Sequence, residues 1–209
     1  MDKRALLEEI ANRIRNCRKC ELYKYRRNPV PGEGNPDAEI LFIGEAPGEK
    51  EDLQGRPFVG AAGKLLNKLI ESIGMRREDV FITNIVKCRP PNNRDPKKEE
   101  IEACTPYLDE QIKIIKPKII VALGRHSAKY ILSKANIKMK SIMQMRGKFF
   151  EIELFGEKIT VFLTLHPAAA LYNPRWRKYL EEDFEKIKEF LKGKKIKRER
   201  TLESFLSQK

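Results

Sequence analysis

The sequence predicts an α/β fold in which a mostly parallel sheet is covered by helices on both faces. Short apolar runs typical of buried strands alternate along the chain with segments whose apolar residues recur at helical spacing. Alternation of this kind favours parallel strands joined by helical crossovers. Two of the apolar runs also stop abruptly at polar residues with glycine or proline, as expected at the edge of such a sheet.

The first half of the chain is expected to supply two helices and two strands. Four apolar residues on one face predict a helix over about Lys3–Asn16, and a Pro/Gly-rich loop follows at Asn28–Pro36. The apolar run Ile40–Ile43 predicts the first strand. A helix at about Gly63–Ser72 and a strand over Val80–Val86 complete this half.

The second half is expected to begin with a helix whose N-cap is Asp95 and whose first turn holds Pro96. Pro106 interrupts that helix, so we expect a kink or a restart just after Cys104. The remaining expected elements, in chain order, are a strand over Ile119–Leu123, a helix over about Ser127–Leu132, a hairpin of Lys148–Leu154 and Lys158–Leu165, and a helix that opens at Asn173.

Composition points to a nucleic-acid partner. The 209 residues contain 43 Lys and Arg against 30 Asp and Glu, which gives a formal net charge of +13. Such an excess indicates a polyanionic partner, and nucleic acid is the default. The charged N-terminus lacks a signal-peptide core, and no apolar run approaches the roughly 20 residues that span a bilayer. We therefore expect a monomer of the cytoplasm that acts at the nucleoid.

The four cysteines predict a metal centre. Cys17 and Cys20 form a C-x-x-C pair ahead of the sheet, while Cys88 and Cys104 follow the second strand. Intracellular chains rarely keep disulfides, so this set favours metal or redox chemistry. A thioredoxin-like pair is disfavoured, because this one follows a helix in a Lys/Arg-rich segment. Spacing alone leaves a Cys₄ zinc site and a [4Fe–4S] cluster both open.

Two short strings mark the expected functional site. Gly44–Gly48 follows the first predicted strand, and His166–Ala169 follows the apolar run Thr160–Leu165. Ligands of open α/β sheets bind beyond the carboxyl ends of the strands. The strings offer a carboxylate, backbone N–H groups and one of only two histidines in the chain, which suit recognition of a polar ring.

Four longer motifs occur in a fixed order with the cysteines. They are Gly44–Asp52, Gly55–Gly60, Thr83–Pro91 and His166–Ala169. Together they resemble the motifs of the family-4 uracil-DNA glycosylases, iron–sulfur enzymes of thermophilic archaea and bacteria, over about residues 17–192. The resemblance implies a three-layer α/β/α sandwich with a four-stranded central sheet. It also implies hydrolysis of the N-glycosidic bond of uracil in DNA, which leaves an abasic site. The implied [4Fe–4S] ligands are Cys17, Cys20, Cys88 and Cys104.

Three residues are expected to handle the uracil ring once the nucleotide has flipped out of the duplex. By resemblance, Phe58 stacks on the base. The Asn84 amide offers a donor and acceptors, so it can meet uracil N3–H and O4, whereas cytosine presents the inverse pattern. His166 is expected to bond uracil O2, where negative charge develops as the base departs. Ordinary structural roles are the alternative for each residue.

Residues of the first motif are expected to line the same pocket. Better-known uracil glycosylases carry an aspartate where this chain has Ala46, whose side chain cannot activate water. By resemblance, the backbone near Glu45, Ala46 and Pro47 contacts the uracil. Glu45 is the candidate for positioning water or supporting the pocket, and Glu51 for the wall that excludes the 5-methyl group of thymine. Solvated loop charges are the alternative for both carboxylates.

The stretch after His166 is expected to meet the DNA. Leu171 or Tyr172 would enter the vacated base stack as a wedge, and Arg175 lies close to them in sequence. Packing at the start of the last helix is the alternative for the two apolar side chains.

The chain is expected to divide into one domain over residues 1–193 and a basic, flexible tail over 194–209. In that tail Leu202, Phe205 and Leu206 would share one face of a helical turn. The pattern resembles the terminal peptide with which repair enzymes dock on the replication sliding clamp, although Glu199 stands where that peptide usually has glutamine. Apolar residues packed on the protein's own last helix are the alternative.

Two other functions remain open from the sequence. A non-enzymatic iron–sulfur or zinc module that binds nucleic acid would account for the charge and the cysteines. It would leave Phe58, Asn84 and His166 unexplained as a set. A related glycosylase for other deaminated bases, such as hypoxanthine, is the second alternative.

Overall fold

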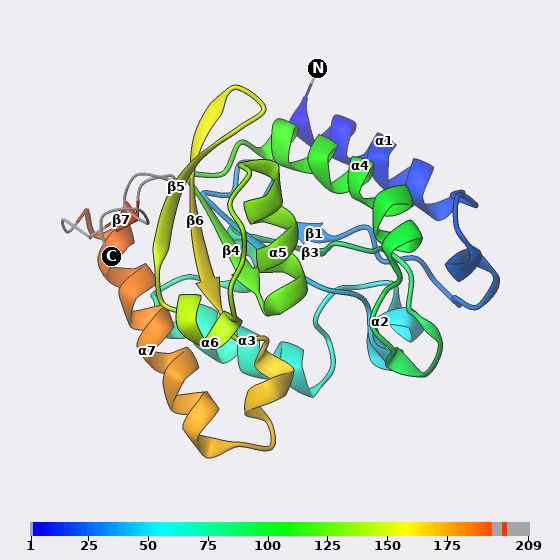
Figure 1. Cartoon of the computed structure of the whole chain (residues 1–209). Helices are drawn as coiled ribbons and strands as arrows, with labels where there is room; N and C mark the ends of the chain where they lie inside the picture. The colour runs from blue at the N-terminus through cyan, green and yellow to red at the C-terminus, as the bar shows by residue number, and fades with distance from the viewer. Residues whose placement is uncertain (1, 194–197, 200–209) are drawn as a thin grey trace.

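A computed structural model describes residues 2–193 and 198–199 of the chain (Figure 1). Its centre is one sheet with the strand order β1-β3-β2-β4-β6-β5-β7. The strands are β1 (Glu33–Gly34), β2 (Ile40–Gly44), β3 (Phe81–Asn84), β4 (Ile119–Leu123), β5 (Phe149–Leu154), β6 (Glu157–Thr164) and β7 (Arg198–Glu199). Neighbours among β3, β2, β4 and β6 run parallel, as predicted, while β1 and β5 pair antiparallel with β3 and β6.

Helices surround this sheet. The α-helices are α1 (Lys3–Arg15), α2 (Glu49–Gln54), α3 (Ala61–Ser72), α4 (Lys98–Ile115), α5 (Arg125–Lys134), α6 (Ile142–Met145) and α7 (Pro174–Leu191). The described residues also form the 3-10 helices η1 (Glu21–Lys24), η2 (Arg77–Asp79), η3 (Pro91–Asn93) and η4 (Pro167–Ala170). Within the described ranges, no helix has the length and apolar character needed to cross a membrane.

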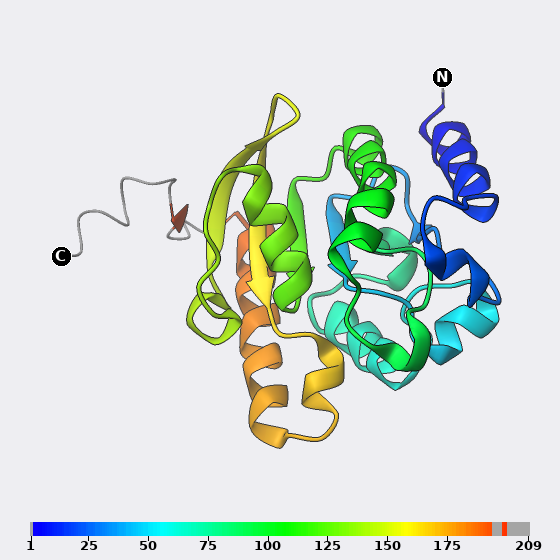
Figure 2. The same cartoon turned by 45° about the vertical axis from the view of Figure 1, so that its right-hand side comes forward.

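The fold is the expected three-layer α/β/α sandwich (Figure 1 and Figure 2). One apolar core unites the sheet with α1, α4 and α5, and a second unites it with α3 and α7. In β2, Leu41 and Ile43 belong to the first core, while Ile40 and Phe42 belong to the second, because side chains alternate along a strand. Burial on both faces explains why the parallel strands are continuous apolar runs.

The sheet has three strands beyond the expected four-stranded centre. β5 is the first arm of the predicted hairpin, which turns at Phe155 and Gly156 as expected. β1 arises inside the predicted loop, where Glu33 pairs with Ile82. β7 runs beside β5, with Arg198 opposite Phe149. Strands of two residues are too short to leave a periodic pattern in the sequence.

Two expectations for α4 are not met, namely a restart after Cys104 and an N-cap at Asp95. α4 runs unbroken through Pro106, so no restart follows Cys104. Pro106 and Glu102 are both exposed, so water can bond the Glu102 carbonyl that the proline leaves without a helical partner. The N-cap of α4 is Lys97 and not Asp95, whose carboxylate bonds the Arg125 guanidinium instead. α2 and α6 were not expected, since six and four residues carry little helical periodicity.

Candidate active site

The carboxyl ends of the parallel strands enclose a cavity of about 390 Å³. Glu45 follows β2, Asn84 ends β3, and His166 lies just beyond β6. The strand order reverses its direction at β2, which places the cavity at the switch point where open α/β sheets bind ligands. Every residue expected at the uracil lines this cavity, namely Glu45, Ala46, Pro47, Glu51, Phe58, Asn84 and His166.

Gly44, the last residue of β2, makes room for two of these side chains. A Cβ atom at this position would lie 2.3 Å from Asn84 Oδ1 and 2.7 Å from Cζ of Phe58. No side chain fits there unless both neighbours move. Glycine at the start of the first motif therefore allows the Asn84 and Phe58 side chains to lie against the end of β2.

Asn84 carries an unpaired acceptor. It is the last residue of β3, so it lies at the end of a strand and not in the middle of a longer one. The side chain is 1% exposed. Among the residues that the structure describes, its Oδ1 is the one buried side-chain nitrogen or oxygen without a hydrogen-bond partner. An orphaned buried acceptor is costly for the fold, so it points to a role in binding.

His166 presents a neutral N–H donor. Its Nδ1 accepts a hydrogen bond of 3.1 Å from the backbone N–H of Ala168, so the ring of the neutral imidazole carries its proton on Nε2. Burial lowers the pKa of His166 to about 4, although the carboxylate of Glu51 opposes the shift. At neutral pH the imidazole is therefore uncharged and its Nε2–H is available to a ligand.

The rings of Phe58 and His166 lie next to each other on the wall of the cavity. The two ring centroids lie 5.5 Å apart with the planes 28° from parallel. Phe58 lies in the loop between α2 and α3, as the glycines around it indicate, and is 5% exposed. Its φ of +50° lies in the left-handed region, which is uncommon for a bulky side chain. Something in the surrounding structure must hold this conformation.

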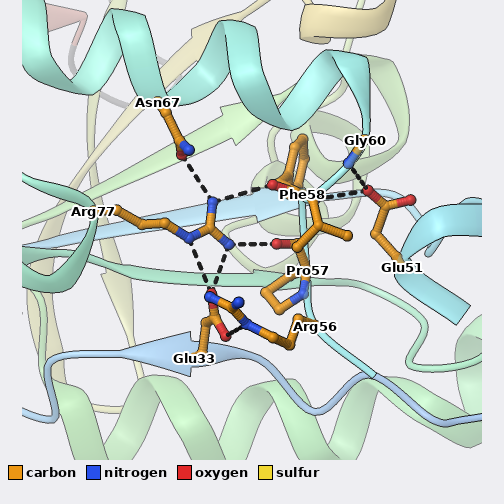
Figure 3. Close-up of polar contacts among 9 residues, drawn as sticks. Glu33, Glu51, Arg56, Pro57, Phe58, Gly60, Asn67 and Arg77 are labelled. Atoms are coloured by element: carbon orange, nitrogen blue, oxygen red, sulfur yellow. Dashed lines mark hydrogen bonds and ion pairs between the residues drawn. The ribbon is translucent and has the colours of Figure 1, made fainter. Parts of the chain in front are cut away.

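Glu51 bonds the backbone of the cavity wall (Figure 3). One carboxylate oxygen accepts hydrogen bonds of 2.8 Å from the N–H groups of Val59 and Gly60, and the other accepts from the N–H of Gly48 at 3.1 Å. These bonds tie the start of α2 to the loop that carries Phe58. The alternative of a solvated loop charge is therefore wrong for Glu51.

Glu45 is a half-buried carboxylate in a polar corner of the cavity. Burial raises the pKa of Glu45, while the nearby His126 opposes that shift. Its Oε2 lies 3.6 Å from His126 Nε2, and Asp95 Oδ2 lies 3.3 Å from the same nitrogen. A cavity carboxylate with a raised pKa is a candidate for acid–base chemistry. Ala46 and Pro47 continue the wall beside it.

One wall of the cavity was not assigned from the sequence. It comes from the connection between β3 and α4 and consists of Pro90, Asn93, Arg94 and Asp95. Arg94 is held by Glu100 at 2.6 Å. The Thr83–Pro91 motif ends within this connection. The residues at its end and just after it could therefore have been assigned to the cavity wall from the sequence.

The three residues expected to meet DNA lie outside the cavity, on the segment that follows His166. Leu171 is the C-cap of η4 and is 38% exposed, and Tyr172 is 91% exposed. Arg175 lies in the first turn of α7, where its Nε donates to the Tyr179 hydroxyl at 3.1 Å. The side chains of Leu171 and Tyr172 are therefore accessible to a partner that reaches the cavity.

The four cysteines, which no disulfide joins, line a second, smaller cavity. Burial raises the pKa of the Cys20, Cys88 and Cys104 thiols, in the last case to about 12. Such thiols stay protonated unless a cation binds them. Arg26 Nη1 donates to Cys88 Sγ at 3.1 Å, and the Lys87 N–H donates to Cys104 Sγ at 3.2 Å.

Comparisons with known proteins agree with this geometry. The sequence model of the Uracil DNA glycosylase superfamily matches residues 31–192. The type-4 uracil-DNA glycosylase of Saccharolobus solfataricus is 62% identical over 201 residues, which cover 96% of this chain and 91% of that protein. The type-4 uracil-DNA glycosylases of Archaeoglobus fulgidus and Thermotoga maritima are 53% and 47% identical to this chain. The two alignments each cover 90% of this chain, and they cover 94% and 95% of the respective relatives. The chain therefore belongs to the uracil-DNA glycosylase superfamily and, within it, to the type-4 uracil-DNA glycosylases.

Proposed function

We propose that this uracil-DNA glycosylase binds a flipped uracil in the cavity at the carboxyl edge of the sheet. The observation that carries the proposal is the buried Oδ1 of Asn84, which lines the cavity without a partner. Uracil N3–H is a donor that would satisfy this atom, whereas cytosine has no hydrogen at N3. Cytosine would leave the acceptor unpaired, so the site would reject the normal base and accept its deamination product.

The cavity would also stabilise the departing base. Phe58 would stack on one face of the ring. His166 would donate its Nε2–H to uracil O2, where negative charge develops as the glycosidic bond breaks. A donor aimed at developing charge is typically worth ~3 kcal/mol of barrier height. The low pKa of His166 supports this role, because the imidazole donates without first losing or gaining a proton.

Hydrolysis requires one water molecule. Its oxygen forms a bond to the sugar C1′ while the bond from C1′ to the base nitrogen breaks, and the bonding electrons leave with uracil. A proton from the water restores neutral uracil. Glu45 is the cavity carboxylate that would position this water, and its raised pKa suits it to accept a proton. Ala46 would contribute backbone and apolar surface only.

We propose that the cysteine cavity holds a [4Fe–4S] cluster on Cys17, Cys20, Cys88 and Cys104. Zinc–sulfur bonds of ~2.3 Å in a tetrahedron keep the sulfurs about 3.8 Å apart. Among the described residues, no three cysteine sulfurs lie within 4.8 Å of one another. A cluster whose four irons each take one thiolate fits this wider spacing. It would tie the segment after α1 to α4, and hydrolysis of a glycosidic bond needs no electron from it.

The remaining proposals concern the DNA. Leu171 or Tyr172 would fill the gap left by the flipped base, and Arg175 would meet a nearby phosphate. Residues 1–193 would act as a single domain and as a monomer in the cytoplasm.

Release of free uracil tests the function. Oligonucleotides that contain uracil, hypoxanthine, xanthine or only normal bases are incubated with the protein, and free base and abasic sites are measured. We expect uracil release and an abasic site without a strand break. Release of hypoxanthine but not of uracil would assign a different base, and binding without any release would indicate a non-enzymatic module.

A further inference from the structure

Hydrogen bonds hold the backbone of the loop that carries Phe58 from two sides (Figure 3). On one side the Glu51 carboxylate accepts from the N–H groups of Val59 and Gly60. On the other side the carbonyls of Pro57 and Phe58 both accept hydrogen bonds from the guanidinium of Arg77. Four consecutive residues are thus fixed through their backbone, and the residue in the left-handed conformation lies among them.

Arg77 lies in η2, outside the cavity, and uses all of its donors. The guanidinium makes five hydrogen bonds and has five N–H groups to give. Nη1 donates to the Phe58 carbonyl at 3.1 Å and to Asn67 Oδ1, on α3, at 2.9 Å. Nη2 donates to the Pro57 carbonyl and, at 2.7 Å, to Glu33 Oε1, which also accepts from Nε at 3.0 Å.

Glu33 holds the guanidinium in place from β1. Its carboxylate also accepts from Arg56 at 2.7 and 3.0 Å, so one carboxylate orients two guanidinium groups. The side chain of Arg77 is 18% exposed and that of Glu33 28%, which separates this pair from the freely solvated ion pairs of the surface. Burial alone would raise the pKa of Glu33, but the bonds from Arg56 and Arg77 outweigh it and lower the pKa.

Helix α3 packs directly against the backbone of Phe58. A Cβ atom on Gly63 would lie 1.8 Å from the Phe58 carbonyl oxygen, so the helix backbone touches this carbonyl directly. Arg77 binds the same oxygen and, through Asn67, the same helix. On this side of the loop, therefore, the Phe58 backbone is held by Arg77, Asn67 and Gly63, none of which lines the cavity.

We propose that Arg77 is a positioning residue for base recognition. It holds Phe58 in the left-handed conformation that turns the ring toward uracil, and Glu33 holds Arg77 in turn. This inference rests on the proposed role of Phe58 as the stacking platform. Lysine cannot replace Arg77, because an ammonium group cannot bond two successive carbonyls, an amide and a carboxylate in one plane.

The test is a double-mutant cycle between Arg77 and Phe58. Single-turnover excision of uracil is measured for Arg77→Gln, Arg77→Lys, Phe58→Ala and the double variant Arg77→Gln/Phe58→Ala. Arg76→Gln is the matched control, because Arg76 is adjacent, carries the same charge and pairs only with Glu78 and Asp79. We expect Arg77→Gln to slow excision about 10- to 100-fold, as a misplaced reactive group does, and Arg77→Lys to give little rescue. Arg76→Gln should stay close to the unmodified protein.

The cycle separates positioning from stability. If Arg77 acts through Phe58, the double variant is no slower than Phe58→Ala alone. Melting temperatures of all four variants show whether any loss of rate merely follows a loss of folded protein. Losses of rate that multiply, or a normal rate for Arg77→Gln, would overturn the inference. A normal rate for Phe58→Ala alone would instead remove the proposed stacking role and the inference with it. Should Arg77→Gln fail to fold, Glu33→Gln supplies a milder loss that must show the same dependence on Phe58.

Discussion

His166 combines a fixed tautomer with a fixed charge state. The Ala168 N–H donates a hydrogen bond to Nδ1. Burial lowers the pKa of His166 to about 4, so the ring is neutral above that pH. A charged imidazole would be a stronger donor but would cost desolvation in this site. A neutral donor delivers its hydrogen bond with no change of protonation across the physiological range. Folding must supply the free energy that keeps the ring neutral, and this has a measurable consequence.

Replacing His166 should change how stability depends on pH. The pKa of a histidine in the unfolded chain is near 6.5, so between pH 6.5 and 4 the unfolded state binds a proton that the folded state does not. Stability therefore falls as pH falls through this window, by about 2 kcal/mol from pH 7 to pH 5. His166→Gln should lose this part of the pH dependence, measured by denaturant unfolding at both pH values. Equal pH dependence of the two proteins would contradict the buried neutral ring.

Asn84→Asp tests the amide as the reader of the base. The carboxylate keeps the acceptor but loses the donor, and it places a negative charge beside uracil O4. We expect excision to fall by at least about 100-fold, because a buried polar group is left unpaired. Binding to uracil-free DNA, measured by fluorescence anisotropy, should change little. Excision at the normal rate would show that base recognition lies elsewhere.

At the residue scale, predictability followed local sequence context. Phe58, Asn84 and His166 stand out because each is a polar or aromatic residue in a place where the pattern expects something else. Arg77 does not stand out. Its partner Glu33 lies 44 residues away in sequence, and one arginine among many gives no local sign of such a contact.

At the scale of elements, the cysteine segments lie next to two helices, α1 and α4, that already pack against each other. Cys17 directly follows Asn16, the C-cap of α1, and Cys104 lies within α4. These two helices lie side by side in the same core (Figure 1). A cluster on the four thiolates would lock them together and fix the wall between β3 and α4, which lines the base cavity.

Protein purified anaerobically should be brown and should contain about four iron and four sulfide per chain. Cys17→Ser should lower the melting temperature and the iron content more than it lowers excision by the molecules that remain folded. The reason is that no cysteine lines the base cavity. One zinc per chain without iron would overturn the cluster. Iron content by colorimetric assay and the visible spectrum provide the measurement.

The parallel strands were predictable because a strand that is buried on both faces needs a continuous run of apolar residues. The short elements were not. β1 and β7 have two residues each, and α2 has six, so hydrophobic periodicity cannot register them. The uninterrupted α4 shows a different limit, since a proline on an exposed helix face can be tolerated when water replaces the missing partner.

At the scale of the whole molecule, the positive charge and the tail concern partners beyond the base. The expected clamp-binding residues Leu202, Phe205 and Leu206 lie outside the described residues. Arg198 and Glu199 are described and extend the sheet beside β5.

Deletion of residues 201–209 should abolish binding to the cognate sliding clamp and leave uracil excision unchanged. The physical reason is that the sequence spacing would place the three apolar side chains on one helical turn, which could fill an apolar groove. The residues that line the base cavity all lie between 45 and 168. Surface plasmon resonance with immobilised clamp measures the first effect, and free uracil release measures the second. Undiminished clamp binding by the truncated protein would refute the role of these residues.

The order of the cavity walls along the chain has a consequence during translation. Glu45, Phe58 and Asn84 all leave the ribosome before His166, which follows Asn84 by 82 residues. At about 5–20 residues per second, Asn84 is synthesised roughly 4 to 16 seconds before His166. A nascent chain therefore passes through a stage with three of these four residues made and the fourth still to come. Any message truncated within this window yields a protein without His166.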